Sequence, residues 1–213
     1  MAKYGLKSFA NDVARFGLIV AMPFFNLKRH FDGSKAELKQ LLKIKGKAII
    51  VANHTGFSDP IVLDLLFWRR RVRFLAAKEV MHSKLLEILL KGAGCISIDR
   101  DIFDFASIKK CMEVLDEGKM LIMFPGGRIE AEAKAYKSGV ALMAARTAAP
   151  ILPVYIAPKE QGVKGKHLVL GRPIDPVEIC GKMPSKAKLD ELAAYIKTKE
   201  DELERQYNEL WHK

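Results

Sequence analysis

The residues best suited to catalysis lie in one polar turn, residues 53–60, which reads Asn-His-Thr-Gly-Phe-Ser-Asp-Pro. A histidine titrates near neutral pH and can take a proton from an alcohol. A carboxylate hydrogen-bonded to its second ring nitrogen fixes the tautomer and stabilises the imidazolium that forms. Four residues separate His54 from Asp59, and a compact turn can bring the two side chains together. The turn therefore carries a candidate general base and a supporting carboxylate.

Both residues also have structural explanations. His54 follows the apolar run 48–52, and a histidine at the end of a strand is more often structural than catalytic. Asp59 precedes Pro60, and Asp is a good N-cap for a helix that a proline opens. The spacing of two residues leaves the structural and the catalytic interpretations open.

Strands and helices that can position this turn alternate along the chain. Short apolar runs predict strands at 48–52, 72–77, 95–98, 120–124, 151–156 and 167–170. Amphipathic stretches predict helices after Pro60, at 83–91, ahead of Gly118, at 139–148 and from about residue 186 onward. The alternation predicts an α/β fold, a mixed sheet flanked by helices, with a long C-terminal helix. The segment 157–166, rich in Gly and Lys, is expected to be an exposed loop.

The N-terminal residues 1–27 have the spacing of an amphipathic helix with basic flanks. Their apolar stretch, 16–25, is about half of the ~20 residues needed to cross a bilayer as a helix. It lacks a small-residue cleavage motif, so secretion is not expected. Two interpretations stay open for this helix, packing on the core of its own chain or lying on a membrane surface.

Composition fits a globular protein that meets phosphate-rich partners. Of the 213 residues, 49% are hydrophobic and 29% charged, and the net charge is +11. Nucleic acid, anionic lipid and an acidic carrier protein would all be attracted by this charge. Nucleic acid is disfavoured, because the aromatic residues interleave with apolar runs and not with the lysines. The three cysteines, Cys95, Cys111 and Cys180, have no metal-ligand spacing and fit buried thiols in a reducing cytoplasm.

The polar turn has companions farther along the chain. They are the segments Phe-Leu-Ala-Ala-Lys-Glu at 74–79, Gly-Cys-Ile-Ser-Ile-Asp-Arg at 94–100, Phe-Pro-Gly-Gly-Arg at 124–128 and Ile-Leu-Pro-Val at 151–154. Together with Asn53-His54 and Asp59, and in this order, they resemble the signatures of the glycerolipid acyltransferases that include the 1-acylglycerol-3-phosphate enzymes. The resemblance covers roughly residues 48–156, and it favours the catalytic interpretation of His54 and Asp59.

The resemblance also implies substrate contacts. In the second signature, the arginine that matches Arg100 is associated with the phosphate of the acceptor, for which a guanidinium is well shaped. Lys78 would add a point charge toward the same phosphate. Gly126, Gly127 and Arg128 match the third signature, which normally reads Phe-Pro-Glu-Gly-Thr-Arg. The glutamate associated with the glycerol portion is thus replaced by Gly126, which weakens the assignment of the acceptor.

The resemblance implies an acyltransferase that uses neither a metal nor a cofactor. The expected reaction moves a fatty-acyl chain from acyl carrier protein or a coenzyme A thioester to a lysophospholipid, at an anionic membrane surface on the cytoplasmic side of the cell membrane. We expect residues 1–45 to form an N-terminal membrane-associating segment and residues 46–213 the acyltransferase domain. A different hydroxyl acceptor, or a lipid-binding module without catalysis, is the alternative.

Overall fold

The computed structural model describes residues 20, 23, 26–56, 58–70, 72–77, 95–98, 105–124, 130–158, 164–181 and 183–211. Its centre is a seven-stranded sheet with the strand order β1-β7-β6-β2-β5-β3-β4. The strands are β1 (Leu27–Phe31), β2 (Ala48–Ala52), β3 (Val72–Ala77), β4 (Cys95–Ile98), β5 (Met120–Met123), β6 (Ile151–Ile156) and β7 (Lys166–Leu170).

All neighbouring strands run parallel except β6 and β7, which are antiparallel. The sheet is therefore mixed, as the sequence predicted. At its centre, β2 lies between β5 and β6, with Val51 opposite Met123 on one side and Pro153 on the other. The carboxyl ends of these three parallel strands meet at one edge of the sheet, which is where open α/β sheets place their functional groups.

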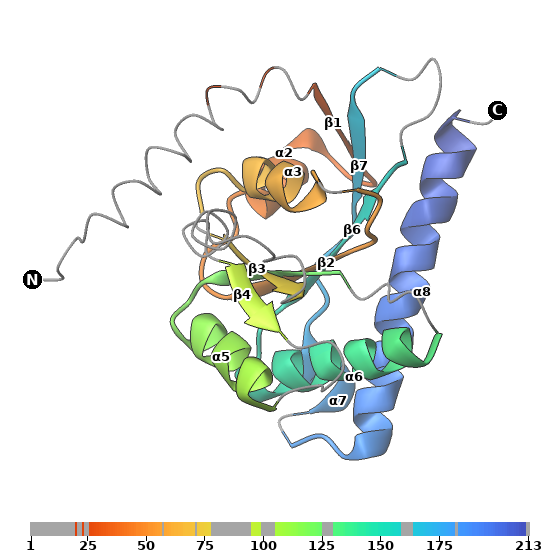
Figure 1. Ribbon diagram of the computed structural model, residues 1–213. Helices are drawn as coiled ribbons and strands as arrows, with labels where there is room; N and C mark the ends of the chain where they lie inside the picture. The colour runs from red at the N-terminus through yellow and green to blue at the C-terminus, as the bar shows by residue number, and fades with distance from the viewer. Residues whose placement is uncertain are drawn as a thin grey trace, which may run out of the picture.

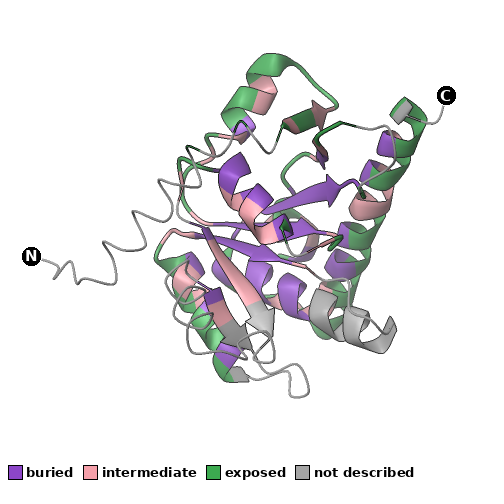
Figure 2. Ribbon diagram, turned by 45° about the horizontal axis from the view of Figure 1, so that its top comes forward, coloured by how far each residue is buried: buried purple, intermediate pink, exposed green. Residues whose placement is uncertain are grey.

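Helices cover both faces of the sheet (Figure 1). On one face lie α2 (Lys35–Leu41) and α3 (Asp59–Leu66), packed against alternate residues of β2 such as Ile50. On the other face, α5 (Phe105–Asp116), α6 (Glu130–Thr147), α7 (Pro176–Cys180) and the long α8 (Lys186–Trp211) cover Ile49 and Val51. Because both faces are covered, every residue of β2 is buried, and the central strands are purple in Figure 2.

The strands at 48–52, 72–77, 95–98 and 151–156 have the predicted bounds, and the long C-terminal helix is confirmed. Helix α6 begins at residue 130, earlier than the predicted 139, and α7 was not predicted. The helix expected at 83–91 and nearly all of the amphipathic helix expected at 1–27 lie outside the described residues.

Strand β1 and helix α2 were also not predicted. β1 pairs in parallel with β7 at the edge of the sheet and exposes Lys28 and Arg29. Charged residues on an edge strand discourage pairing with another chain. They also interrupt the apolar run from which a strand would be predicted, so β1 was not expected. Ser34 starts α2 with a capping box to Glu37, and Leu41 at its end is buried against the sheet.

None of the helices in the described ranges combines the length and the apolar character that crossing a membrane requires.

Candidate active site

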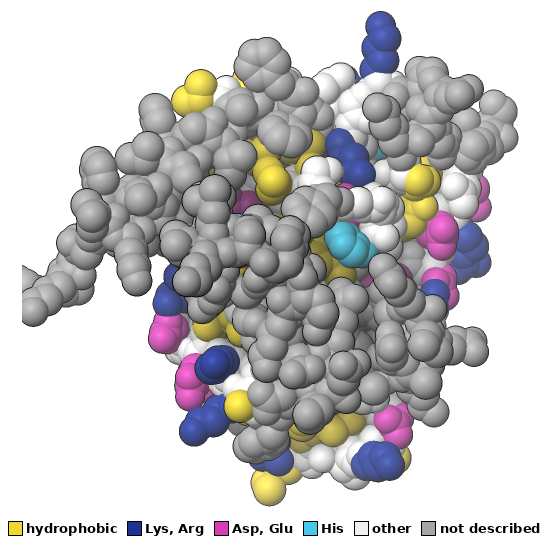
Figure 3. Space-filling view, viewed as in Figure 1, with side chains coloured by type: hydrophobic (Ala, Val, Ile, Leu, Met, Phe, Trp, Pro, Cys, Tyr) yellow, Lys and Arg dark blue, Asp and Glu magenta, His cyan; other side chains and the backbone are white. Residues whose placement is uncertain are grey.

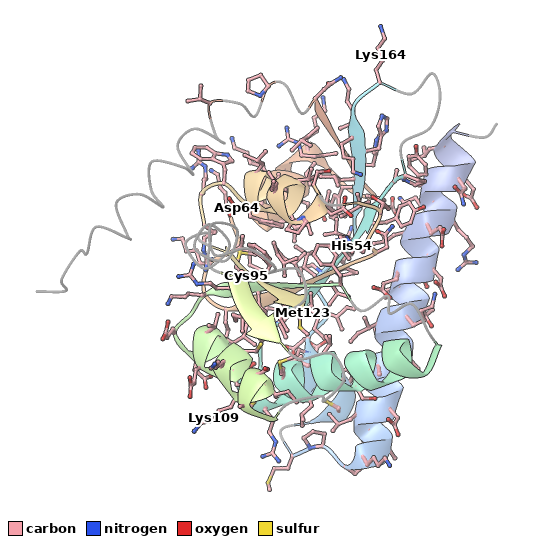
Figure 4. The ribbon with its side chains drawn as sticks, viewed as in Figure 1. His54, Asp64, Cys95, Lys109, Met123 and Lys164 are labelled. Carbon is pink, nitrogen blue, oxygen red and sulfur yellow. The ribbon has the colours of Figure 1, made fainter. Side chains whose placement is uncertain are left out.

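The polar turn predicted to carry catalysis connects the end of β2 to the start of α3. His54 lies two residues beyond Ala52, at the edge where the parallel strands end, and Figure 4 labels it near the middle of the molecule. Ser58 occupies the N-cap position of α3, and Asp59 is the first helical residue, ahead of Pro60. The interpretation of Asp59 as the N-cap of this helix is therefore wrong, since Ser58 holds that place.

The turn brings His54 and Asp59 into direct contact. Nδ1 of His54 lies 2.9 Å from Oδ2 of Asp59. The same oxygen accepts hydrogen bonds from the backbone N–H groups of Thr55, at 2.6 Å, and Gly56, at 2.7 Å. An ionised carboxylate only accepts, so it fixes the histidine in the tautomer with the proton on Nδ1. The hydrogen-bonding pattern is that of a base and its supporting carboxylate.

Asp59 is fully buried, with none of its side chain exposed. Burial is the largest influence on the pKa of its carboxyl group, and it acts to raise that pKa. Hydrogen bonds from the two backbone amides and from His54, with the charge of Lys166, act in the opposite direction and outweigh it. The pKa of Asp59 therefore lies below its ordinary value, and the group is a carboxylate at neutral pH.

His54, in contrast, is open to solvent. Its side chain is 44% exposed, so a hydroxyl group can approach the ring while Asp59 stays buried beneath it. A histidine is visible in the middle of the face drawn in Figure 3, at the place where Figure 4, from the same side, labels His54. Phe124, which follows β5, packs beside the imidazole with the ring centroids 4.7 Å apart and the planes inclined by 30°.

Asn53 holds the turn to the next strand. Its side chain donates from Nδ2 to the carbonyl oxygen of Ile156, at 2.8 Å, and accepts at Oδ1 from the N–H of the same residue, at 2.6 Å. The amide group thereby continues the pairing of β2 with β6 one step past the strand end. The sequence predicted no role for Asn53, and its position directly before His54 was the only local signal.

Lys166, the first residue of β7, is a site residue that the sequence analysis missed. Its Nζ lies 2.9 Å from Oγ1 of Thr55 and 3.3 Å from Oδ1 of Asp59. The sequence predicted Lys166 at the end of an exposed loop. No local pattern marks it as a site residue, because only the antiparallel return of β7 along β6 brings residue 166 back to the carboxyl end of β2.

The other predicted site residues, Lys78, Arg100, Gly126, Gly127 and Arg128, lie outside the described residues. All three cysteines are buried, and burial raises the pKa of the Cys111 thiol to about 12, which argues against a cysteine nucleophile there. Within the described ranges, no group of three or more His, Cys, Asp or Glu side chains is arranged to hold a metal ion.

Comparison with known proteins identifies the family. The sequence model of the Acyltransferase family matches residues 33–157, more than half of the chain and including the whole turn. A 1-acyl-sn-glycerol-3-phosphate acyltransferase of Bacillus subtilis (strain 168) is 28% identical over 183 residues, which are 84% of this chain and 92% of the relative.

A solved structure has a similar fold. The crystal structure of the 1-acyl-sn-glycerophosphate (LPA) acyltransferase PlsC from Thermotoga maritima superposes with a TM-score of 0.61 at 18% identity, covering 94% of this chain and 81% of that one. At this identity the likeness concerns the fold. The chain therefore belongs to the Acyltransferase family, and within that family it resembles the PlsC-like 1-acyl-sn-glycerol-3-phosphate acyltransferases.

Proposed function

We propose that this protein transfers a fatty-acyl chain from an acyl thioester to the free hydroxyl of 1-acylglycerol 3-phosphate, making phosphatidic acid for phospholipid synthesis. The observation that carries the proposal is the contact between exposed His54 and buried, ionised Asp59. The Bacillus relative, which bears the name of this activity, supports the choice of acceptor. The acyl donor is the acyl thioester of acyl carrier protein or of coenzyme A.

The reaction needs one base and no covalent enzyme intermediate. The Nε2 atom of His54 takes the proton of the acceptor hydroxyl as the oxygen attacks the thioester carbonyl. The imidazolium is stabilised by Asp59, which already accepts the Nδ1–H bond. Collapse of the tetrahedral intermediate breaks the carbon–sulfur bond, and the proton on His54 passes to the leaving thiolate. An ester and a free thiol result, and His54 returns to its starting state.

Substrate binding is assigned from the sequence signatures. We assign the acceptor phosphate to Arg100 and Lys78, because a guanidinium and an ammonium both bind phosphate oxygens. Gly126, Gly127 and Arg128 would line the acceptor site beyond Phe124. Since Phe124 contacts the His54 ring, the third signature starts beside the proposed base.

A second acceptor is favoured by one specific residue. Gly126 stands where the third signature usually has glutamate, the residue associated with the glycerol portion of the acceptor. A different lysolipid or hydroxyl acceptor would then take the same acyl group through the same base. A lipid-binding module without catalysis is the remaining candidate.

The location follows from the substrates and the charge. Lysophosphatidic acid is an amphiphile held in bilayers, and the net charge of +11 favours both an anionic membrane surface and an acidic carrier protein. We propose that the segment 1–45 meets the cytoplasmic side of the cell membrane, while its residues 27–41 also add β1 and α2 to the sheet of the catalytic domain.

The test is acyl transfer by purified protein in lipid vesicles. Labelled acyl carrier protein and acyl-coenzyme A thioesters are offered with a panel of lysolipids and other hydroxyl acceptors, and the lipid products are identified. We expect phosphatidic acid from wild type and only background from His54→Ala, with both proteins bound equally to the vesicles. Product from another acceptor alone would select the second acceptor. Vesicle binding without any thioester turnover would select the lipid-binding module.

A further inference from the structure

Lys166 lies beside Oδ1 of Asp59, the carboxylate oxygen that His54 does not contact. The Oδ2 atom of Asp59 receives His54 Nδ1 and the two backbone amides, whereas Oδ1 lies 3.3 Å from Lys166 Nζ. Thr55 links the two groups, since its hydroxyl accepts from Lys166 at 2.9 Å and donates to Asp59 Oδ1 at 3.2 Å. Both carboxylate oxygens are thus held, and rotation of the carboxylate would break several bonds at once.

The backbone is arranged to deliver this lysine. Gly165, directly before it, has a φ of 94°, in the left-handed region. A Cβ at this position would lie 2.4 Å from the carbonyl oxygen of Asn26, the same oxygen that accepts from the N–H of Lys166 at 3.2 Å. β7 runs antiparallel to β6, with Leu168 opposite Ile156. This register places Lys166 beside the turn that follows β2.

Lys166 also acts on the charge state of Asp59. Its positive charge helps to hold the pKa of the buried carboxyl group below its ordinary value, so Asp59 stays an ionised acceptor for His54. The Lys166 side chain is only 19% exposed, so solvent screens its charge on Asp59 incompletely. From the other described elements around the pair, β5 is followed by the uncharged Phe124 and β6 contributes the main chain of Ile156.

We propose that Lys166 is a positioning residue, which acts with the Thr55 hydroxyl to fix the Asp59 carboxylate toward Nδ1 of His54. The proposal rests on the proposed acyl transfer by His54. It assigns Lys166 no contact with substrate. Its removal should therefore act on kcat and leave the KM for the acyl donor nearly unchanged.

The test compares Lys166→Met with Lys166→Arg and with Lys164→Met as the matched control. Lys164 is exposed two residues away and points outward in Figure 4, so its loss removes the same charge from the same strand end. We expect Lys166→Met to lower kcat about 10- to 100-fold. Lys166→Arg should recover part of the loss, and Lys164→Met should match wild type.

A second variant covers the case in which Lys166→Met does not fold. Thr55→Val keeps every charge but removes the hydroxyl bridge, and we expect it to lower kcat about five- to tenfold, the equivalent of one hydrogen bond. A wild-type kcat in both folded variants, or a loss confined to KM, would overturn the proposal.

An NMR measurement of the Nδ1–H proton of His54, which bonds Asp59, separates this proposal from the proposed function. We expect its resonance to broaden or move upfield in Lys166→Met and to stay as in wild type in Lys164→Met, and it is measured without substrate. An unchanged resonance in Lys166→Met contradicts the role of Lys166 even in an active enzyme. A changed resonance supports that role even if wild type transfers no acyl group to any acceptor.

Discussion

Asp59 accepts hydrogen bonds on both carboxylate oxygens, and each of its named partners is a donor. These are His54, Lys166, the hydroxyl of Thr55 and the backbone amides of Thr55 and Gly56. An amide in the same place would turn an N–H group toward donors that need an acceptor. The environment therefore selects a carboxylate, whereas an N-cap position would accept asparagine equally well.

Replacing Asp59 by Asn tests whether the charge is required. We expect kcat to fall roughly 10³- to 10⁴-fold, since the imidazolium loses its partner and the tautomer is no longer fixed. The matched control is Asp190→Asn, which removes the same charge at an exposed position on α8. Acyl transfer by Asp59→Asn at the rate of Asp190→Asn would reduce Asp59 to a structural residue.

Asn53 supports the pair through the backbone. Replacing it by Ala leaves the N–H and C=O of Ile156 without their side-chain partner, and we expect a loss of about 1–3 kcal/mol in the free energy of unfolding. We also expect kcat to fall, because His54 is the next residue. Urea denaturation and acyl-transfer rates measure the two effects. Asn208→Ala, at an exposed position on α8, is the control that should leave both unchanged.

At the scale of the elements, the sequence predicted what is local. The runs that form β2 and β6 are apolar over their whole length because both faces of these strands are buried, so composition alone locates them. His54 and Asp59 lie within one short turn, so spacing could suggest their contact. Lys166 lies 111 residues from Thr55, and only the pairing of β6 with β7 brings them together. The spacing of residues along the chain therefore could not predict that contact.

Strand β1 was missed for a related reason, and its attachment involves a pair of histidines. His30 in β1 and His167 in β7 stack with ring centroids 5.2 Å apart, and His30 Nε2 lies 3.1 Å from His167 Nδ1. Tyr207 of α8 meets His167 edge-on, with the centroids 6.0 Å apart. β1, with three basic residues in five, thus joins the sheet partly through contacts between aromatic rings. A hydropathy pattern does not reveal such contacts.

This attachment should weaken in acid. Burial, and then the charge of His167, hold the pKa of His30 below its ordinary value of about 6.5. The unfolded chain therefore binds the proton more readily, and the stability that neutral His30 provides is complete above pH 6.5 and declines as the pH falls toward the lower folded pKa. We expect the urea midpoint of wild type to drop between pH 7.5 and 5.5.

His30→Phe, which keeps an aromatic ring in the stack, should show a smaller drop over the same range. Arg29→Met, an exposed change on the same strand that adds no group titrating there, should follow wild type. Equal pH dependence in wild type and His30→Phe would mean that other groups account for the acid sensitivity.

At the scale of the whole molecule, the positive charge is unevenly placed. The segment 26–47, which contains β1 and α2, has seven Lys or Arg residues and two acidic residues. Helix α8 has five basic and seven acidic residues, and several of them are paired along the helix, as Lys188 is with Glu191 and Lys199 with Glu202. The excess charge thus lies toward the N-terminal part of the chain, largely within the segment proposed to meet the membrane.

The uneven charge predicts which surface meets anionic lipid. We expect the double variant Lys28→Met/Arg29→Met to bind vesicles of phosphatidylglycerol and phosphatidylcholine about 30-fold more weakly than wild type, since each basic residue near such a surface contributes about 1 kcal/mol. Lys186→Met/Arg205→Met removes the same charge from exposed positions on α8 and should bind nearly as wild type does. Vesicle flotation measures both, and 0.5 M salt should shrink the difference by screening. Equal weakening by the two double variants would show that total charge, and not its placement on β1, governs binding.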